Sequence, residues 1–209
     1  MPLIRKDRLQ KDVILGLWKI EENSEYFEGL LDLSTVELDQ LGSLKSRRRT
    51  EWLASRWLLH VLSDRDRRGA LVKDHFGKPH LIGSEWHISL SHTHGYAAVI
   101  AAKKSVGIDI QVRVSKITRI AHKFLSEKER TNIARHREID FLHIYWGIKE
   151  SLYKAYGRRV LDYKKNLLVK AFNLEQQKTK ASISTDVTTS YEARFELLPD
   201  FVLTYVIKK

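Results

Sequence analysis

One apolar, strand-like run contains an aspartate that could bind a metal. From Val106 to Val112 the sequence alternates, so the Val and Ile side chains share one face of a strand and Asp109 lies on the other. A carboxylate in such surroundings is either a hydrogen-bonded structural group or a ligand of a hard cation. Gln111 lies on the same face as Asp109, so the two side chains could converge on one ion or one water molecule.

A second carboxylate, Glu150, follows Lys149 directly and precedes Lys154 by one helical turn, in the segment WGIKESLYK. If this helix face is exposed, Glu150 and Lys154 form a surface salt bridge worth only about 0.3–0.5 kcal/mol. The alternative is a metal ligand beside a bound phosphate. In that case the carboxylate holds Mg²⁺, and the lysines neutralise phosphate oxygens that the metal does not reach.

The end of a predicted strand offers polar groups that could bind an anion. Ser91 and His92 present a hydroxyl group, backbone amides and an imidazole. A Ser–His nucleophile pair is a weaker interpretation, because no nucleophile-elbow pattern surrounds these residues. A zinc site formed by His92 and His94 is weaker still, because two ligands are too few.

Basic residues in the N-terminal half could contact phosphate groups. Lys78 lies in a Gly-Lys-Pro turn, and Arg47 opens a predicted helix. Lys73 is a further cation in the same half of the chain. The residue types alone do not separate a phosphate site from an ordinary basic surface.

The spacing of apolar residues predicts strands and helices in an order that occurs twice along the chain. Two capping boxes, Ser34 with Glu37 and Ser126 with Glu129, mark helix starts, and Gly157 ends the longest helix. We expect strands over residues 13–20, 86–90, 96–102, 106–112, 171–174, 191–198 and 201–207, and helices from 35, over 44–62, 117–124, 126–136 and 140–156.

This order predicts an α+β fold in which one chain forms two similar lobes related by a pseudo-twofold axis. Each lobe would hold a small antiparallel sheet with helices. Residues 1–105 would form the N-terminal lobe and residues 106–209 the C-terminal lobe, with the active site at the lobe interface. No repeat is visible at the level of single residues.

The composition excludes several classes of protein. The chain has no cysteine, which excludes disulfides, thiolate metal sites and a cysteine nucleophile. No apolar run approaches the roughly 18 residues of a membrane span, and the first twelve residues are charged where a signal peptide would be apolar. Hydrophobic residues make up 43% of the chain, enough to bury a core. We therefore expect a soluble, cytoplasmic protein.

Positive charge is concentrated in the C-terminal half. The net charge is +11, and residues 106–209 contain 20 Lys and Arg against 12 Asp and Glu. Between residues 112 and 137, eight basic residues accompany only two acidic ones. Such a surface attracts nucleic acid, an anionic membrane, or an acidic protein or phosphorylated ligand.

The order of these segments resembles the 4′-phosphopantetheinyl transferase superfamily, in the two-lobed type that activates peptide synthetases and polyketide synthases. The Gly-Ile-Asp and Trp-x-x-Lys-Glu-x-x-x-Lys motifs are its most specific part, and the resemblance runs from about Arg47 to Lys154. In chain order the matching segments are Gly77-Lys-Pro79, Ile88-Ser-Leu-Ser-His92, Gly107-Ile-Asp-Ile-Gln111, Phe124-Leu-Ser-Glu-Lys-Glu129 and Trp146 to Lys154.

The resemblance implies a holo-[acyl-carrier-protein] synthase-type enzyme. Such an enzyme transfers the 4′-phosphopantetheine arm of coenzyme A to a serine of an apo carrier protein, depends on Mg²⁺ and releases adenosine 3′,5′-bisphosphate. Asp109 and Glu150 would bind the metal. The coenzyme A-binding residues would be Arg47, Lys73, Lys78, Ser91, His92, Lys149 and Lys154.

The resemblance leaves two roles open. The base that accepts the serine proton would be Glu150, directly or through a metal-bound water, or Glu129, which matches the acidic position after Phe124. Gln111 departs from the pattern, because many relatives have a glutamate there. We expect the Gln111 oxygen, or a water, to fill the third position at the metal.

An acidic carrier, acyl or peptidyl, would dock on the basic stretch that begins after the metal strand. The expected docking residues are Arg113, Lys116, Arg119, Ile117, Ile120 and Phe124. We expect a monomer that binds neither nucleic acid nor a membrane. The alternatives are a non-catalytic scaffold that binds coenzyme A or a carrier, and a basic nucleic-acid-binding module, against which the paired carboxylates argue.

Overall fold

The computed structural model of the protein describes residues 2–158 and 160–209. Contacts between Cα atoms divide the chain into two compact units, Met1–Lys104 and Ser105–Lys209. In the described part of the chain, no helix combines the length and apolarity that crossing a membrane requires.

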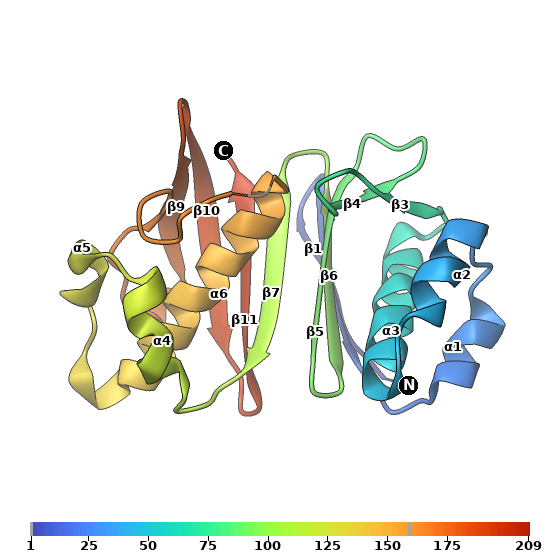
Figure 1. Ribbon diagram of the computed structural model, residues 1–209, viewed down its shortest axis with the longest axis horizontal. Helices are drawn as coiled ribbons and strands as arrows, with labels where there is room; N and C mark the ends of the chain where they lie inside the picture. Colours follow the sequence, from blue (N-terminus) through green and yellow to red (C-terminus); the bar gives the residue numbers. More distant parts are fainter. Residues whose placement is uncertain (1, 159) are drawn as a thin grey trace. The chain divides into compact units, whose positions relative to one another are not determined.

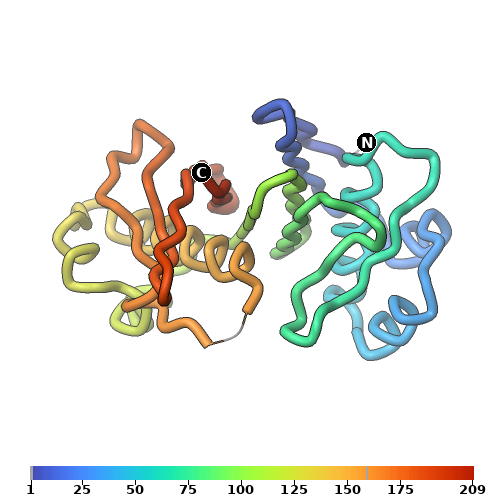
Figure 2. Tube along the Cα trace, turned by 90° about the horizontal axis from the view of Figure 1, so that it is seen from above, coloured from blue at the N-terminus to red at the C-terminus, as the bar shows by residue number. Residues whose placement is uncertain are grey.

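Unit 1 is a four-stranded antiparallel sheet with helices on one side (Figures 1 and 2). In spatial order the sheet consists of β1 (Leu3–Gln10), β2 (Val13–Lys19), β6 (Tyr96–Ala102) and β5 (His87–Thr93). A separate hairpin pairs β3 (Leu71–Lys73) with β4 (Pro79–Leu81), and the helices are α1 (Ser24–Leu30), α2 (Thr35–Gly42) and α3 (Ser46–Ser63). The long helix α3 packs against β6, β2 and β5, and this contact holds the core of unit 1.

Unit 2 is a five-stranded antiparallel sheet with the chain's longest helix across it (Figure 1). In spatial order the strands are β7 (Val106–Val112), β11 (Phe201–Lys208), β10 (Thr188–Leu197), β9 (Lys178–Ser184) and β8 (Leu167–Val169). The α-helices are α4 (Ile117–Phe124), α5 (Glu127–Arg130) and α6 (Glu138–Tyr156), with 3₁₀ turns at Arg135–Arg137 and Leu174–Gln176. Helix α6 packs mainly on β7 and β11.

The predicted α+β class with antiparallel sheets is confirmed, and so are the helix signals in the sequence. Glu37 accepts hydrogen bonds from the backbone and hydroxyl of Ser34, which starts α2. Ser126 and Glu129 form the second capping box. Helix α6 ends at Gly157, whose φ of 69° lies in the left-handed region that glycine adopts without strain.

Other predicted elements are displaced or shorter. The strand predicted over 86–90 extends further, so that Ser91 and His92 lie within β5, because β5 pairs with β6 as far as Thr93 and Tyr96. The helix predicted over 126–136 is wrong beyond its first turn.

That helix stops because its continuation is held by the core of unit 2. The side-chain amide of Asn132 donates to the hydroxyl of Tyr145 and the carbonyl of Phe172, and Ile133 and Ala134 pack against the core. The strand predicted over 171–174 lies earlier, at Leu167–Val169. Strand β1 is not predicted, because charged residues occupy both of its faces: Arg5 and Asp7 lie on the half-buried face, and Lys6 and Arg8 lie on the exposed face.

Two glycines bring α6 unusually close to the sheet of unit 2. A Cβ atom on Gly107, in β7, would lie 1.8 Å from the carbonyl oxygen of Ser151 in α6. A Cβ atom on Gly147, in α6, would lie 2.8 Å from the Thr204 side chain and 2.9 Å from Gln111 Nε2. Only glycine fits at either position, so the Gly of the Gly-Ile-Asp motif sets the distance between the two elements that carry Asp109 and Glu150.

Substituting Gly107 tests this close approach. We expect Gly107→Ala to lower the free energy of unfolding by about 1–3 kcal/mol or more, because the backbone must move to admit the methyl group. Urea unfolding followed by circular dichroism measures this. Gly29→Ala is the matched control: it lies in α1, with no described atom within 4 Å of the added Cβ, and should stabilise by roughly 0.5–1 kcal/mol. Equal effects of the two variants would contradict the packing argument.

Candidate functional site

The face of α6 toward β7 carries the polar side chains of the candidate site. Lys154 Nζ donates to Asp109 Oδ1 at 2.7 Å and to the carbonyl of Ile108 at 3.0 Å. Glu150 lies one turn earlier on the same helix face. Lys154 therefore forms an ion pair with Asp109 of β7, and not the simple surface pair with Glu150 that the helix spacing alone would allow.

Glu150 is half-buried and held by a tyrosine from the segment after α6. The hydroxyl of Tyr163 donates to Glu150 Oε1 at 2.9 Å. Burial raises the pKa of Glu150 above its ordinary value, and the charge of Asp109 raises it further. Asp109 and Glu150 therefore interact as like charges within one unit, and a bound cation would relieve this repulsion.

The raised pKa of Glu150 predicts how metal-free protein responds to pH. Because the folded-state pKa lies above the unfolded value of about 4.5, the protonated carboxyl stabilises the fold fully below that pH. This contribution is lost as the pH rises through the raised pKa. In EDTA, Glu150→Gln should match the wild type in Tm at pH 4 and exceed it at pH 7.5. A variant that melts below the wild type at pH 7.5 would contradict this.

Gln111 is oriented by a buried histidine. His143 Nδ1 lies 2.9 Å from Gln111 Oε1, and the backbone N–H of Val114 donates to His143 Nε2 at 2.9 Å. The Gln111 amide nitrogen donates to Asp109 Oδ2 at 3.2 Å and to the His143 carbonyl at 3.3 Å. The prediction that the Gln111 oxygen binds the metal is therefore corrected. That oxygen faces His143, and the amide nitrogen faces Asp109.

The donor set fits a metal that takes most of its ligands from elsewhere. Within residues 2–158 and 160–209, no group of three or more His, Cys, Asp or Glu could hold an ion. Asp109 and Glu150 supply two carboxylates. Mg²⁺ in proteins is commonly bound by one or two carboxylates together with substrate phosphates and water, so this pair suits Mg²⁺ rather than a protein-caged metal.

Lys149 and Glu129 lie in the interior, contrary to their expected places in a binding site. Lys149 is 0% exposed and Glu129 3%. Lys149 Nζ donates to Glu129 Oε2 at 2.7 Å and to the carbonyls of Phe124 and Tyr163 at 2.7 and 2.8 Å. These three bonds use all the ammonium protons. Glu129 also accepts from the backbone N–H groups of Ser126 and Val169.

This pair is therefore corrected to a structural one. Helix geometry gives the reason: Lys149 is one position from Glu150 and so points about 100° away, toward the core.

In unit 1, a buried glutamate joins two residues predicted to bind coenzyme A. Glu51, in α3, lies 3.1 Å from His92 Nδ1 through Oε2 and 3.3 Å from Arg47 Nε through Oε1. Ser91 is buried in β5 and Lys73 is exposed on β3. Burial lowers the pKa of Lys78, and Asp74 partly opposes this. The structure thus brings Arg47 and His92 together through Glu51.

Two of the three apolar residues expected to contact a carrier are core residues. Ile117 is 4% exposed and Phe124 0%, and both belong to the core of unit 2. The expectation is corrected for these two, because α4 turns its 117–121–124 face inward. Ile120 is partly exposed.

The expected basic docking residues divide in a similar way. Arg113 donates to Asp140 Oδ1 at 3.1 Å and to the carbonyls of Leu198 and Pro199 at 3.0 and 2.8 Å, so it ties β7 to the β10–β11 turn. Lys116 and Arg119 are exposed. Of the three, these two supply the exposed positive surface.

Three residues of the site were not predicted from the sequence. His143 and Glu51 each orient a predicted residue, and Tyr163 orients Glu150. Glu51 had a signal, since it lies one helical turn after Arg47 and so shares its helix face. No sequence signal identifies Tyr163 or His143, because each reaches its partner through the tertiary fold and not through local spacing.

Two comparisons with known proteins bear on this site. Residues 105–206 match the family model described as the 4′-phosphopantetheinyl transferase superfamily, which confirms the resemblance that the motifs indicated. A curated protein named 4′-phosphopantetheinyl transferase, from Bacillus subtilis, is 25% identical over 134 residues. The match covers 62% of this chain and 54% of that relative, so the chain spans about half the length of the relative.

Proposed function

We propose, from the family that residues 105–206 match, that this protein transfers the 4′-phosphopantetheine arm of coenzyme A to a serine of an apo carrier protein. The serine oxygen bonds to the β-phosphorus as the pyrophosphate P–O bond breaks, which releases adenosine 3′,5′-bisphosphate. The observation that carries the proposal is the pair of repelling carboxylates, Asp109 and Glu150, beside the Lys154 ammonium group.

In this proposal Asp109 and Glu150 hold Mg²⁺. The ion would neutralise charge on the pyrophosphate oxygens as the bond to the leaving group breaks. Gln111 fixes the orientation of Asp109, and Tyr163 that of Glu150. Lys154 is the cation that we propose for a phosphate oxygen, because its ammonium group lies beside the carboxylate of Asp109.

Glu150 is also the acid we propose as acceptor of the serine proton. A carboxylate beside the metal can accept this proton directly or through a metal-bound water. Glu129 does not suit this role, because its two oxygens are buried and bonded to Lys149, Ser126 and Val169.

We further propose that the nucleotide end of coenzyme A binds residues of unit 1. Arg47, Lys73, Lys78 and His92 are cations or potential cations, and Ser91 adds a hydroxyl group. Coenzyme A carries a 3′-phosphate besides its pyrophosphate, and each charge-assisted hydrogen bond to such a group contributes roughly 1.5–3 kcal/mol.

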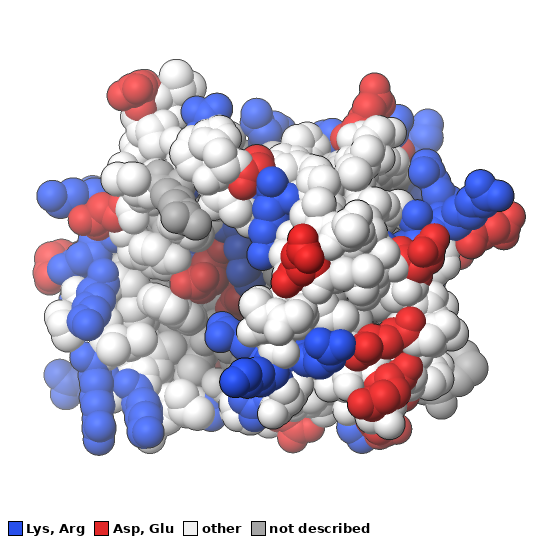
Figure 3. Space-filling view, turned by 45° about the vertical axis from the view of Figure 1, so that its right-hand side comes forward, with Lys and Arg blue, Asp and Glu red and all other residues white. Residues whose placement is uncertain are grey.

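An acidic carrier would dock beside α4, where Lys116 and Arg119 are exposed. Lys and Arg side chains (blue) are numerous on the surface, as Figure 3 shows for one face of the molecule. Reversing both charges, Lys116→Glu with Arg119→Glu, should raise KM for the carrier roughly tenfold at low salt and less at high salt. KM for coenzyme A should not change.

The matched control for docking is Lys178→Glu with Lys180→Glu, two exposed lysines on β9. This pair alters the net charge equally. If both pairs raise KM for the carrier alike, the effect is one of net charge, and the α4 docking proposal is wrong.

The proposed function is tested by incubating the protein with Mg²⁺, coenzyme A and a panel of apo carriers. Mass spectrometry should show a carrier gain of one phosphopantetheine group, abolished by EDTA. No gain on any carrier, with coenzyme A still bound, would favour a non-catalytic scaffold. Binding of nucleic acid without binding of coenzyme A would favour the basic-module alternative.

A further inference from the structure

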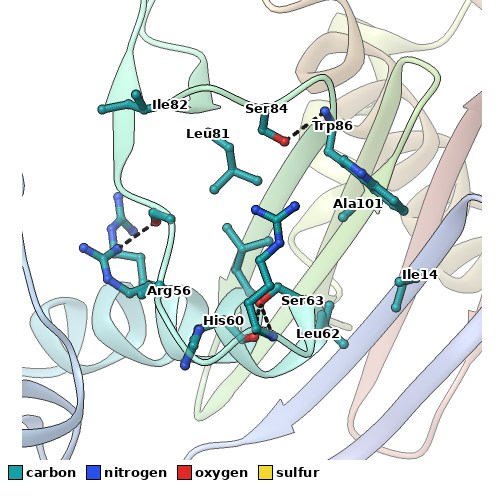
Figure 4. Close-up of a pocket in the computed structure, with 14 residues that line it drawn as sticks. Ile14, Arg56, His60, Leu62, Ser63, Leu81, Ile82, Ser84, Trp86 and Ala101 are labelled. Atoms are coloured by element: carbon teal, nitrogen blue, oxygen red, sulfur yellow. Dashed lines mark hydrogen bonds between the residues drawn. The ribbon is translucent and has the colours of Figure 1, made fainter.

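A pocket in unit 1 lies apart from the residues proposed to bind coenzyme A, the metal or a carrier. Its volume is about 150 Å³, and it lies between the C-terminal half of α3 and the segment from Leu81 to Trp86 (Figure 4). All of its lining residues belong to unit 1. Because the pocket shares no residue with the proposed transfer site, a ligand bound in it would be independent of the proposed function.

One wall of the pocket contains a buried arginine that is not fully bonded. Arg56 is 6% exposed, and within the described residues its Nε has no hydrogen-bond partner. Its Nη1 donates to the Trp52 carbonyl at 3.2 Å, and its guanidinium carbon lies 3.2 Å from the centre of the Trp52 ring. Burial lowers the pKa of Arg56 to about 9, with Glu37 opposing this, so the group is still charged at neutral pH.

Among the described residues, the positive charge on this wall is only partly balanced. Glu37 is the nearby carboxylate, and Arg68 occupies both of its oxygens, at 2.8 and 2.5 Å. Arg56 Nε is left 3.9 Å from Glu37 Oε1, beyond hydrogen-bond distance. Two guanidinium groups therefore share one carboxylate, and the exposed Arg65 also lines the pocket, so positive charge exceeds negative charge on this wall. A buried charge without a full set of partners is costly, and a ligand anion would supply the missing one.

A second buried polar atom lies on the same wall. His60, one turn after Arg56 in α3, has a buried Nδ1 with no partner among the described residues. Burial lowers the pKa of this histidine, and the charge of Arg68 lowers it further, so the ring is neutral. A neutral imidazole can donate one hydrogen bond to a ligand oxygen.

The facing wall is apolar. Figure 4 shows Trp86, Ala101 and Ile14 on the side of the pocket opposite Arg56 and His60. An apolar cavity of about 150 Å³ accommodates a molecule the size of benzene. The pocket thus joins a wall with excess positive charge to an apolar space that is large enough for one aromatic ring.

We propose that this pocket binds a small organic monocarboxylate with an aromatic or short aliphatic body. The carboxylate would accept hydrogen bonds from Arg56 and His60, and the body would lie against Trp86 and Ala101. A carboxylate with an apolar body uses both the cationic and the apolar wall, whereas inorganic phosphate would leave the apolar wall without a partner.

The test is a titration of the full chain with benzoate, followed by the indole N–H signal of Trp86 in two-dimensional NMR. The signal is assigned by its loss in Trp86→Phe. We expect saturable binding of benzoate, and at least about tenfold weaker binding of benzyl alcohol and benzylamine, which match it in shape but not in charge. Equal binding of benzoate and benzyl alcohol would overturn the proposal.

Two variants and a control locate the site. Arg56→Met should weaken benzoate binding at least about tenfold, since a charged hydrogen bond is lost. Arg67→Met, an exposed arginine outside the pocket, should leave it unchanged. Should Arg56→Met fail to fold, Ser84→Phe fills the pocket from a loop and should abolish binding. If benzoate binds Ser84→Phe as it binds the wild type, it binds elsewhere and the proposal is wrong.

Discussion

Replacing Asp109 with Asn, or Glu150 with Gln, should lower kcat for phosphopantetheine transfer about 10²–10³-fold or more while the fold persists. Each substitution keeps the shape of the side chain and removes a negative charge that would hold Mg²⁺. The rate is read from the mass gain of an apo carrier under saturating coenzyme A. Because the metal would stabilise charge in the transition state, the loss should fall on kcat more than on KM.

The control for this loss lies in the same helix. Glu138→Gln removes an exposed carboxylate from the first turn of α6 and should leave kcat unchanged. The Mg²⁺ concentration needed for half-maximal rate should rise in Asp109→Asn and Glu150→Gln, and stay constant in Glu138→Gln. An Asp109→Asn variant with the wild-type rate and Mg²⁺ dependence would remove Asp109 from the metal site.

The residue types of the site can be predicted from the sequence, but the directions in which their side chains point can be predicted only in part. The alternation in β7 correctly predicts that Asp109 and Gln111 share a face of the strand. It does not predict which end of the Gln111 amide faces Asp109, because that is decided by His143, 32 residues away on α6. A hydrogen-bond partner on another element leaves no trace in the local pattern.

Helix periodicity predicts the burial of some residues that were expected in the binding sites. Tyr145, Ile148 and Leu152 form the buried stripe of α6, and Lys149 lies four residues after the first and three before the last. Its burial is therefore predictable from spacing alone. The same holds for α4, where Ile117 and Phe124 are one apolar face. The family motif assigned Lys149 to coenzyme A, and the docking hypothesis assigned Ile117 and Phe124 to a carrier, whereas their spacing assigns all three to the core.

The close packing of α6 on β7 was beyond sequence reasoning for a different reason. Gly107 is recognised as part of the Gly-Ile-Asp motif. Glycine is required there because the Ser151 carbonyl, 44 positions away, leaves no room for a Cβ atom. The distance between two elements is a tertiary property, and it decides whether the carboxylates of Asp109 and Glu150 interact. The fold class, by contrast, follows from local patterns, and it is predicted correctly even though the helix over 126–136 and the strand over 171–174 are misplaced.

The buried Lys149–Glu129 pair yields the largest expected effect on stability. Lys149→Met should lower the free energy of unfolding by about 3–5 kcal/mol, because Glu129 is left as an uncompensated charge in the interior. The pair links α5 to α6, and through Val169 to β8, so its loss loosens three elements at once. Urea unfolding at neutral pH measures the change. Lys128→Met, which removes an exposed lysine beside Glu129, should change stability by less than about 0.5 kcal/mol.

A double variant separates the ion pair from the packing of the lysine chain. Lys149→Met combined with Glu129→Gln removes both charges, and it should be more stable than Lys149→Met alone, because no buried charge is left unpaired. The Gln amide can still accept from the Val169 backbone. If the double variant is no more stable than Lys149→Met, the cost arises from lost contacts of the Lys149 chain and not from the charge of Glu129.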